Sequence, residues 1–181
     1  MVYVLLAPGF EESEAVVPVD LLRQAGVETA FVSLDGSYVT GSHQITIQAD
    51  CTLAQLDLTK AEMIVLPGGG DGVQNLWNDE RVSALIREAA EKEIWLAALC
   101  AAPVLLGRWG LLDHRHAVSY PTRQQQLGAA LVEPTARTVV DGHFVTGHAC
   151  GSSFDFGLKL VEVLRGKEAV EEINGRIYYY R

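Results

Sequence analysis

The chain has 181 residues, of which 49% are hydrophobic and 20% are charged, a composition typical of one soluble globular domain with a sizeable core. Its 14 Lys and Arg residues stand against 23 Asp and Glu residues, which gives a net charge of −9 at pH 7. Such an acidic surface argues against nucleic acid and anionic membranes as partners. We therefore expect a single domain over residues 1–181 with neither a nucleic-acid nor a membrane partner.

The number and spacing of the cysteines and the length of the apolar segments bear on where in the cell the protein is located. Cys51, Cys100 and Cys150 include no close pair, which indicates a reducing environment rather than a disulfide framework. The apolar start, residues 1–7, lacks basic residues and runs at once into a turn, which is not the pattern of a signal peptide. The longest uncharged core run, residues 94–107, is too short to span a bilayer. These features predict a cytoplasmic protein.

The first half of the chain alternates short apolar runs, which predict buried strands, with segments of helical periodicity. Strands are expected at residues 2–7, 27–34 and 63–66, helices at 14–25 and 80–92, and a small hairpin within 35–50. Pro18 lies early in the first helix, so we expect either an irregular first turn or a helix that starts nearer Val17. A strand, a helix and a strand within about thirty residues form a βαβ unit, which makes the two strands parallel.

A sharp turn from strand to helix at Cys100 is the centre of the pattern. Residues 94–99 form a continuous apolar run, and the helical pattern resumes after Pro103. The nucleophile elbow of serine hydrolases has this geometry, in which the turn lifts one side chain above the sheet. The N–H groups and dipole of the incoming helix are expected to favour the thiolate of Cys100 and so lower its pKa. The alternative is that Cys100 is a small core residue.

Beyond residue 112 the predicted elements become shorter. Strands are expected at 116–119, 131–133, 137–140 and 143–147, and helices at 122–127, 151–164 and 167–173. The dipeptide Asp141-Gly142 is a strong hairpin signal. The helix at 151–164 carries apolar residues at core spacing, namely Phe154, Leu158, Val161 and Leu164. The whole pattern predicts an α/β fold with a mostly parallel sheet and helices on both faces.

Four loops at the carboxyl ends of predicted strands carry the unusual residues: 8–14, 67–72, 99–102 and 147–152. The first loop holds three glutamates, of which one is expected to exchange a proton with the thiol while the others complement a helix dipole. The glycines at 68–70 lack the spacing and the lysine of a phosphate loop. We therefore expect the N–H groups of Gly69 and Ala101 to form an oxyanion hole.

The histidines do not predict a metal centre. His114, His116 and His143 lack the spacing of zinc ligands, so neither a metal nor another cofactor is expected. His148 lies in the fourth loop, two residues before Cys150. It is either a polar pocket residue or a surface histidine.

Four segments then form an ordered set of motifs: Ala7-Pro-Gly-Phe-Glu-Glu-Ser-Glu14, Val65-Leu-Pro-Gly-Gly69, Ala98-Leu-Cys-Ala-Ala-Pro103 and Gly151-Ser-Ser-Phe-Asp-Phe156. Together they resemble the ThiJ/PfpI superfamily, a class I glutamine amidotransferase-like group, and most of all its ThiJ/YajL branch, which includes the parkinsonism-linked protein DJ-1. Matches at 17–20, 74–76 and 166–168 extend the resemblance over nearly the whole chain.

The resemblance implies a flavodoxin-like α/β sandwich, usually a homodimer, with Cys100 as the reactive cysteine and Glu14 as its protonated partner. Gly69 and Ala101 would then supply the backbone donors. Members of the family have been assigned a glyoxalase activity without glutathione, in which the thiolate adds to a 2-oxoaldehyde and yields a 2-hydroxy acid. Others are described as deglycases of glycated protein or nucleotide, as sensors of oxidative stress, or as chaperones.

The chain departs from the family pattern at two places. A motif that often ends in His-Pro reads Val118-Ser-Tyr-Pro121 here, so Tyr120 takes the place of the histidine. A phenol is a poor base at neutral pH, which argues against an intracellular protease. The late loop, often Gly-Pro-Gly, reads Ala149-Cys-Gly151. The resemblance places Cys150 near Cys100, where it could act as a resolving thiol.

We therefore expect a cysteine-dependent glyoxalase or deglycase that acts on a small carbonyl substrate, 2-oxoaldehydes or glycated adducts, and protects against oxidative stress. Cys100 would attack the carbonyl carbon and Glu14 would transfer protons. The alternatives are a redox-sensing thiol protein that works by oxidation of Cys100, and a dimeric chaperone without turnover. The aromatic tail, residues 178–180, is expected to pack against a neighbouring helix.

Overall fold

A seven-stranded sheet forms the middle of the computed structural model, which describes residues 1–179. Its strands are β1 (Val2–Leu6), β2 (Thr29–Ser33), β5 (Cys51–Thr52), β6 (Met63–Leu66), β7 (Trp95–Leu99), β10 (Thr138–Asp141) and β11 (Phe144–Gly147). They lie in the order β10-β11-β7-β6-β1-β2-β5, and every neighbouring pair is parallel except β10 with β11. The run β2-β1-β6-β7-β11 has the strand order of flavodoxin-like folds, which confirms the expected fold class.

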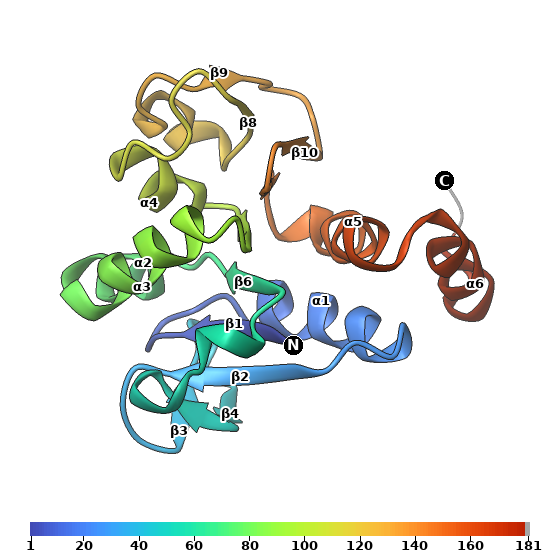
Figure 1. The fold of residues 1–181 in the computed structure, drawn as a ribbon, viewed down its shortest axis with the longest axis horizontal. Helices are drawn as coiled ribbons and strands as arrows, with labels where there is room; N and C mark the ends of the chain where they lie inside the picture. The colour runs from blue at the N-terminus through green and yellow to red at the C-terminus, as the bar shows by residue number, and fades with distance from the viewer. Residues whose placement is uncertain (180–181) are drawn as a thin grey trace.

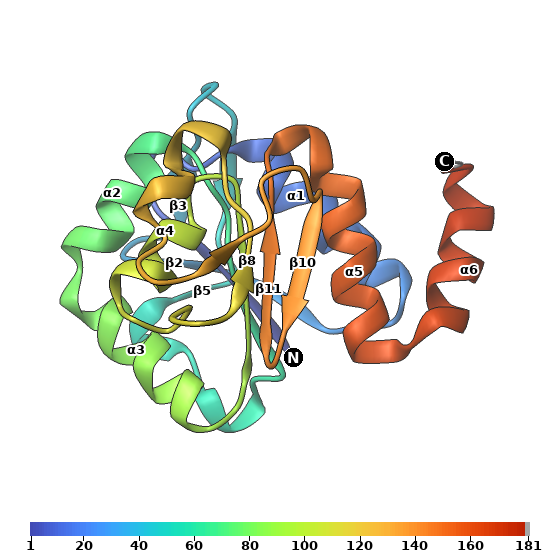
Figure 2. The same ribbon diagram turned by 90° about the horizontal axis from the view of Figure 1, so that it is seen from above.

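Helices cover both faces of this sheet (Figure 2). They are α1 (Glu12–Gln24), α2 (Gly70–Asn78), α3 (Glu80–Glu91), α4 (Pro103–Arg108), α5 (Ser153–Arg165) and α6 (Lys167–Ile177). One apolar cluster joins α1 and α5 to one face of the sheet, and a second cluster joins α2, α3 and α4 to the other face. The strands β1 and β6 are buried along their whole length, as expected for strands covered on both faces. Both views place α6 beyond α5, on the side away from the sheet (Figures 1 and 2).

Short elements complete the chain. A separate antiparallel hairpin is formed by β3 (Tyr38–Thr40) and β4 (Thr46–Gln48), as the sequence predicts. The strands β8 (His116–Ala117) and β9 (Leu131–Val132) pair in parallel. The 3-10 turns are η1 (Leu53–Gln55), η2 (Leu58–Lys60), η3 (Pro121–Gln126) and η4 (Cys150–Ser152). Among residues 1–179, no helix is both long enough and apolar enough to cross a membrane.

Two details of the predicted helices are wrong. The first helix begins at Glu12, and its first turn is regular, because Glu14 N–H and Ala15 N–H already donate to Glu11 O. Pro18 lies beyond that turn, so the missing N–H affects only the helix interior. Phe154 is 43% exposed instead of buried, because the helix α5 turns Phe156, Leu158, Leu160 and Val161 toward the sheet.

The helix α2 was not expected from the sequence, which predicts a loop there. Its first turn contains Gly70 and Gly72, and because glycine disfavours helices the sequence there does not predict one. At the other end of the chain, the expected packing of the aromatic tail is confirmed for Tyr179. Its ring stacks on Phe154 at 5.4 Å, and its hydroxyl donates to Asp155 Oδ1 at 2.9 Å. Tyr180 lies outside the described residues.

The crossing of α1 and α5 leaves no room beside Gly157. A Cβ atom there would lie 2.7 Å from Leu21 Cδ1 and 3.0 Å from Pro18 Cα. We expect Gly157→Val to lower the free energy of unfolding by about 2 kcal/mol, because two packed helices must separate to admit the side chain. Urea denaturation measures this change.

Gly175→Ala is the matched control for this prediction. A Cβ atom at Gly175, inside α6, meets nothing within 4 Å. Alanine is the better helix former, so this variant should gain about 0.5–1 kcal/mol. Parent-like stability of Gly157→Val would contradict the close packing of α1 on α5.

Candidate active site

Backbone hydrogen bonds join the four loops singled out in the sequence in two pairs, at one edge of the sheet. The loops follow β1, β6, β7 and β11. These four strands are parallel and lie side by side in the order β11-β7-β6-β1. Glu11 N–H donates to Gly68 O at 3.0 Å, and Cys100 N–H donates to Gly147 O at 3.0 Å. Ligands of such sheets bind outside the carboxyl ends of the strands, so this edge is the candidate active site.

Cys100 occupies the sharp turn between β7 and α4, as the sequence predicts. Its φ of 63° is in the left-handed region, which non-glycine residues rarely adopt. The turn is held by the bond from Cys100 N–H to Gly147 O and by a second bond, 2.7 Å long, from Tyr120 N–H to Cys100 O. The side chain is half-buried. A strained backbone fixed from two sides positions this thiol at the edge of the sheet.

Glu14 lies in the first turn of α1 and is 0% exposed. Its Oε2 accepts a hydrogen bond of 2.8 Å from Gly68 N–H. A Cβ atom on Gly68 would lie 2.5 Å from Glu14 Oε2 and 2.8 Å from Cys100 Cβ. The carboxyl and the cysteine therefore meet in the space that a side chain at position 68 would fill, and their side chains interact directly. Gly68 was not predicted as a site residue. The one sequence signal was its position directly after the β6 strand and Pro67, where a glycine can indicate that another segment packs closely against the backbone.

Burial raises the pKa of Glu14 to about 7, against an ordinary value of 4.5. The Cys100 thiol and the Gly68 N–H act to lower this pKa, and the charge of Glu11 acts to raise it. Glu14 Oε1 is buried and has no hydrogen-bond partner among the described residues. Glu14 therefore holds a proton over much of the neutral range, and its free oxygen can carry that proton toward the sulfur.

The expectation of a lowered thiol pKa is wrong for Cys100. Burial and the charge of an ionised Glu14 raise the pKa of Cys100, and they outweigh a hydrogen bond from Ala101 N–H that lowers it. Nearby Cys150 also acts to raise it. The thiol and the carboxyl therefore titrate as a coupled pair, in which the first proton lost belongs to the pair rather than to either group.

Four of the other predicted site residues, Gly69, Ala101, Tyr120 and Cys150, adjoin this pair, whereas within residues 1–179 His148 makes no hydrogen bond to it. Gly69 is the N-cap of α2 with a φ of 93°, and Ala101 directs its N–H toward the sulfur. Tyr120 contributes its backbone N–H to the elbow, while its side chain is 43% exposed. The half-buried His148 donates its N–H to Arg137 O at 3.0 Å. Cys150 is exposed at the start of η4, close enough to Cys100 for an electrostatic effect on it.

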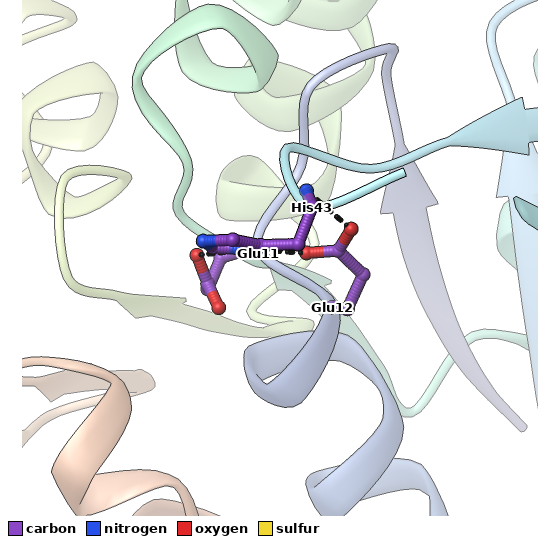
Figure 3. Close-up of side chains that lie close together, drawn as sticks. All are labelled: Glu11, Glu12 and His43. Carbon is purple, nitrogen blue, oxygen red and sulfur yellow. Dashed lines mark hydrogen bonds and ion pairs between the residues drawn. The ribbon is translucent and has the colours of Figure 1, made fainter. Parts of the chain in front are cut away.

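The remaining acids of the first loop form a cluster with His43 (Figure 3). One ligand atom from each of Glu11, Glu12 and His43 lies within 4.8 Å of the others, which is close enough to share a metal ion. Glu12 Oε1 already accepts the N–H groups of His43 (2.7 Å) and Ile45 (3.3 Å), and Oε2 faces His43 Nδ1 at 3.0 Å. Although burial raises its pKa, these bonds lower the pKa of Glu12 to about 2. The Glu12 carboxylate therefore holds the loop between β3 and β4 in place beside the site through these hydrogen bonds.

A doubly wound sheet with a thiol at a strained elbow and a buried carboxyl beside it defines a cysteine-centred flavodoxin-like domain. The chain belongs to the DJ-1/PfpI family, whose model matches residues 1–163. The resemblance inferred from the motifs is thereby confirmed.

Several known proteins are similar to this chain. Protein dj-1beta of Drosophila melanogaster is 36% identical over 94% of this chain and 92% of its own length. The crystal structure of Drosophila melanogaster DJ-1beta has a TM-score of 0.94 at 32% identity, covering 99% of this chain and 98% of that one. An oxidized DJ-1 of Toxoplasma gondii has a TM-score of 0.93 at 31% identity, with the same coverage. A deglycase of Pyrococcus abyssi is 27% identical over 91% of this chain and 99% of its own length.

The raised pKa of Glu14 makes stability depend on pH in a definite direction. Folding raises this pKa from 4.5 to about 7, so the folded chain holds a proton that the unfolded chain releases. This contribution to stability is complete below pH 4.5 and is lost as the pH rises through 7. We expect Glu14→Gln, which keeps the acceptor for Gly68 N–H, to raise the free energy of unfolding by about 3 kcal/mol at pH 8 relative to the parent.

The measurement is urea denaturation of both proteins at pH 4, 6 and 8. The advantage of Glu14→Gln should be small at pH 4 and grow with pH. Glu11→Gln, which alters a less buried carboxylate of the same loop, is the control and should show a much smaller growth, because the charge of Glu11 is the weakest of the effects on the pKa of Glu14. A constant difference between Glu14→Gln and the parent at all three pH values would contradict the buried protonated carboxyl.

Proposed function

We propose that this protein is a cysteine-dependent enzyme that acts on small carbonyl compounds, as a glyoxalase on 2-oxoaldehydes or as a deglycase on glycated adducts. The observation that carries the proposal is the fully buried Glu14, with its pKa raised to about 7, packed beside the Cys100 thiol in the space left by Gly68. An acid whose pKa lies near the working pH is suited to proton transfer in both directions. Similarity to a named deglycase supports the same reading.

In the first step the Glu14 carboxylate takes the proton of the Cys100 thiol, the sulfur adds to the aldehyde carbon of a 2-oxoaldehyde, and the carbonyl electron pair moves onto oxygen. The N–H groups of Ala101 and Gly69 stabilise that oxyanion. Protonated Glu14 then gives its proton to the oxygen, which completes a hemithioacetal. A carboxyl whose Oε1 has no other partner is free to make this transfer.

In the second step the Glu14 carboxylate removes the proton from the former aldehyde carbon, giving an enediolate. Return of that proton to the neighbouring carbon, with transfer of the hydroxyl proton to the former ketone oxygen, yields the thioester of a 2-hydroxy acid. Water hydrolyses the thioester and restores the Cys100 thiol. Substrate and one water together equal the 2-hydroxy acid, so no cofactor is needed for the balance.

Turnover of methylglyoxal to lactate tests this proposal. We expect Cys100→Ser to reduce kcat/KM by at least about a thousandfold, because a hydroxyl in this position is a far weaker nucleophile. Glu14→Gln should cost about a hundredfold or more, because it cannot transfer the proton. Lactate is measured by chromatography after fixed times.

Glu11→Gln is again the matched control, and it should retain most of the activity. In addition, the rate of Cys100 alkylation should rise near pH 7 in the parent, as the pair loses its first proton, and only at higher pH in Glu14→Gln. Full lactate formation by Cys100→Ser would overturn the proposal. A chaperone without turnover would instead form no lactate in the parent and would prevent aggregation of a client protein in both variants.

A second candidate function, a redox-responsive thiol protein, is favoured by the proximity of Cys150 to Cys100 and by similarity to a DJ-1 of Toxoplasma gondii described as oxidized. Two equivalents of peroxide convert the thiolate of Cys100 to a sulfinate with release of two waters. Alternatively, the sulfenic acid formed by one equivalent condenses with the Cys150 thiol to a disulfide and water. The expected homodimer and cytoplasmic location stay predictions under either function.

Mass spectrometry after graded peroxide distinguishes these products. A gain of about 32 Da on the peptide with Cys100 indicates the sulfinate, and a loss of about 2 Da joining it to Cys150 indicates the disulfide. Cys150→Ser should abolish the disulfide and increase the sulfinate, while Cys51→Ser should change neither. Oxidation that spares Cys100 would contradict the redox function.

A further inference from the structure

A small cavity lies directly beside the reactive elbow. Its volume is about 50 Å³, enough for a carboxylate or a similarly small group. Ala101, the residue after the nucleophile, lines it together with Gly70 at the start of α2. The side chains of Arg108 and Arg123 complete its polar wall. The cavity therefore joins the proposed oxyanion hole to two positive charges.

The fold fixes both arginines relative to Cys100. Arg108 ends the helix α4, which begins three residues after the nucleophile. Arg123 lies on η3, and a chain of backbone bonds leads from it to the elbow. Arg123 N–H donates to Tyr120 O at 2.8 Å, and Tyr120 N–H donates to Cys100 O at 2.7 Å. Arg108 Nη2 in turn donates to Gln126 Oε1 of η3 at 3.3 Å, which joins the two elements.

The charges of both arginines are left uncompensated. Thirteen of the fourteen Lys and Arg residues lie within residues 1–179, and nine of them form ion pairs with carboxylates. Arg108 and Arg123 are among the four described residues that form none. The guanidinium of Arg108 lies 5.1 Å from the centre of the Trp77 ring, so both of its partners, Trp77 and Gln126, are neutral.

The charges at the start of α2 do not cancel this field. The α2 macrodipole places a partial positive charge at Gly70, which adds to that of the arginines. Asp71, the acidic residue in the first turn of α2, lines a different cavity with Gly9 and Ser42. In a chain with a net charge of −9, two unpaired guanidinium groups beside the nucleophile form a local site that attracts anions.

We infer that Arg108 and Arg123 form an anion subsite, and that the favoured substrates are carbonyl compounds carrying a carboxylate or phosphate a few atoms from the reacting carbonyl. The reacting carbon sits at Cys100 while the anionic end enters the cavity beyond Ala101. This inference rests on the proposed function for its substrate class, but the anion subsite itself can be tested without turnover.

Alkylation of Cys100 by iodoacetate and by iodoacetamide provides that test, since the two reagents differ by one negative charge. The rates at Cys100 and at the exposed Cys150 are followed by peptide mass spectrometry in the same sample. We expect the ratio of iodoacetate to iodoacetamide rates to be higher at Cys100 than at Cys150. Arg108→Met and Arg123→Met should each lower the ratio at Cys100 by about threefold, and the double variant by about tenfold.

Arg87→Met is the matched control, because Arg87 is an exposed arginine of α3 that forms no ion pair in the described chain and lies outside the cavity. It should leave the ratio at Cys100 unchanged. Because all three positions are exposed, loss of folding is not expected to confuse the comparison. A ratio at Cys100 that is unchanged in the double variant would overturn the inference.

Turnover of a matched substrate pair then tests the substrate class. 4,5-Dioxopentanoate is a 2-oxoaldehyde with a terminal carboxylate, and its methyl ester has the same chain without the charge. We expect kcat/KM to be about tenfold higher for the acid, with the preference lost in the double variant. If neither compound is turned over while the alkylation ratios behave as expected, the proposed function fails and the anion subsite stands. Equal turnover of acid and ester would overturn the preference for anionic substrates.

Discussion

The close approach of Glu14 and Cys100 to the backbone of Gly68 is the constraint on which the rest of the site depends. Their three segments follow β1, β6 and β7, so they meet only because these strands are adjacent and parallel. Any side chain at position 68 would occupy the space that the carboxyl and the cysteine share. The strand order of the fold thus creates the site, and one missing Cβ atom sets its dimensions.

The same arrangement opposes stability in two ways. Folding removes the Glu14 carboxyl from water and holds Cys100 in a backbone conformation that only glycine adopts freely. Extensive burial elsewhere offsets both costs, above all where α1 and α5 pack together on the sheet. Glu12 contributes in the opposite sense, because its carboxylate accepts several hydrogen bonds from the hairpin loop. Two glutamates two residues apart therefore have opposite pKa shifts and different roles.

Periodicity and strand polarity made most of this structure predictable from the sequence. The strands, the elbow at Cys100 and the convergence of four loops follow from short apolar runs and from the geometry of parallel sheets. Features that depend on distances between residues far apart in the chain could not be predicted from the sequence. The helix α2 begins with glycines, which do not predict a helix. Nothing in the sequence distinguishes Gly68 from the glycines that follow it. The solvent exposure of Phe154 depends on how α5 is rotated about its axis. The raised pKa of Cys100 was missed because a sequence shows the helix end and not the burial that outweighs it.

The left-handed φ of Cys100 has a consequence for how the family varies over time. A cysteine in this conformation is strained by about 1 kcal/mol, and a glycine at the same position is not. A mutation that replaces the whole cysteine side chain with the hydrogen of glycine would therefore relieve strain and cost little in folding. Only selection for the chemistry can keep cysteine there. In a duplicated copy freed from that selection, this position should drift toward glycine or asparagine while the surrounding sheet persists.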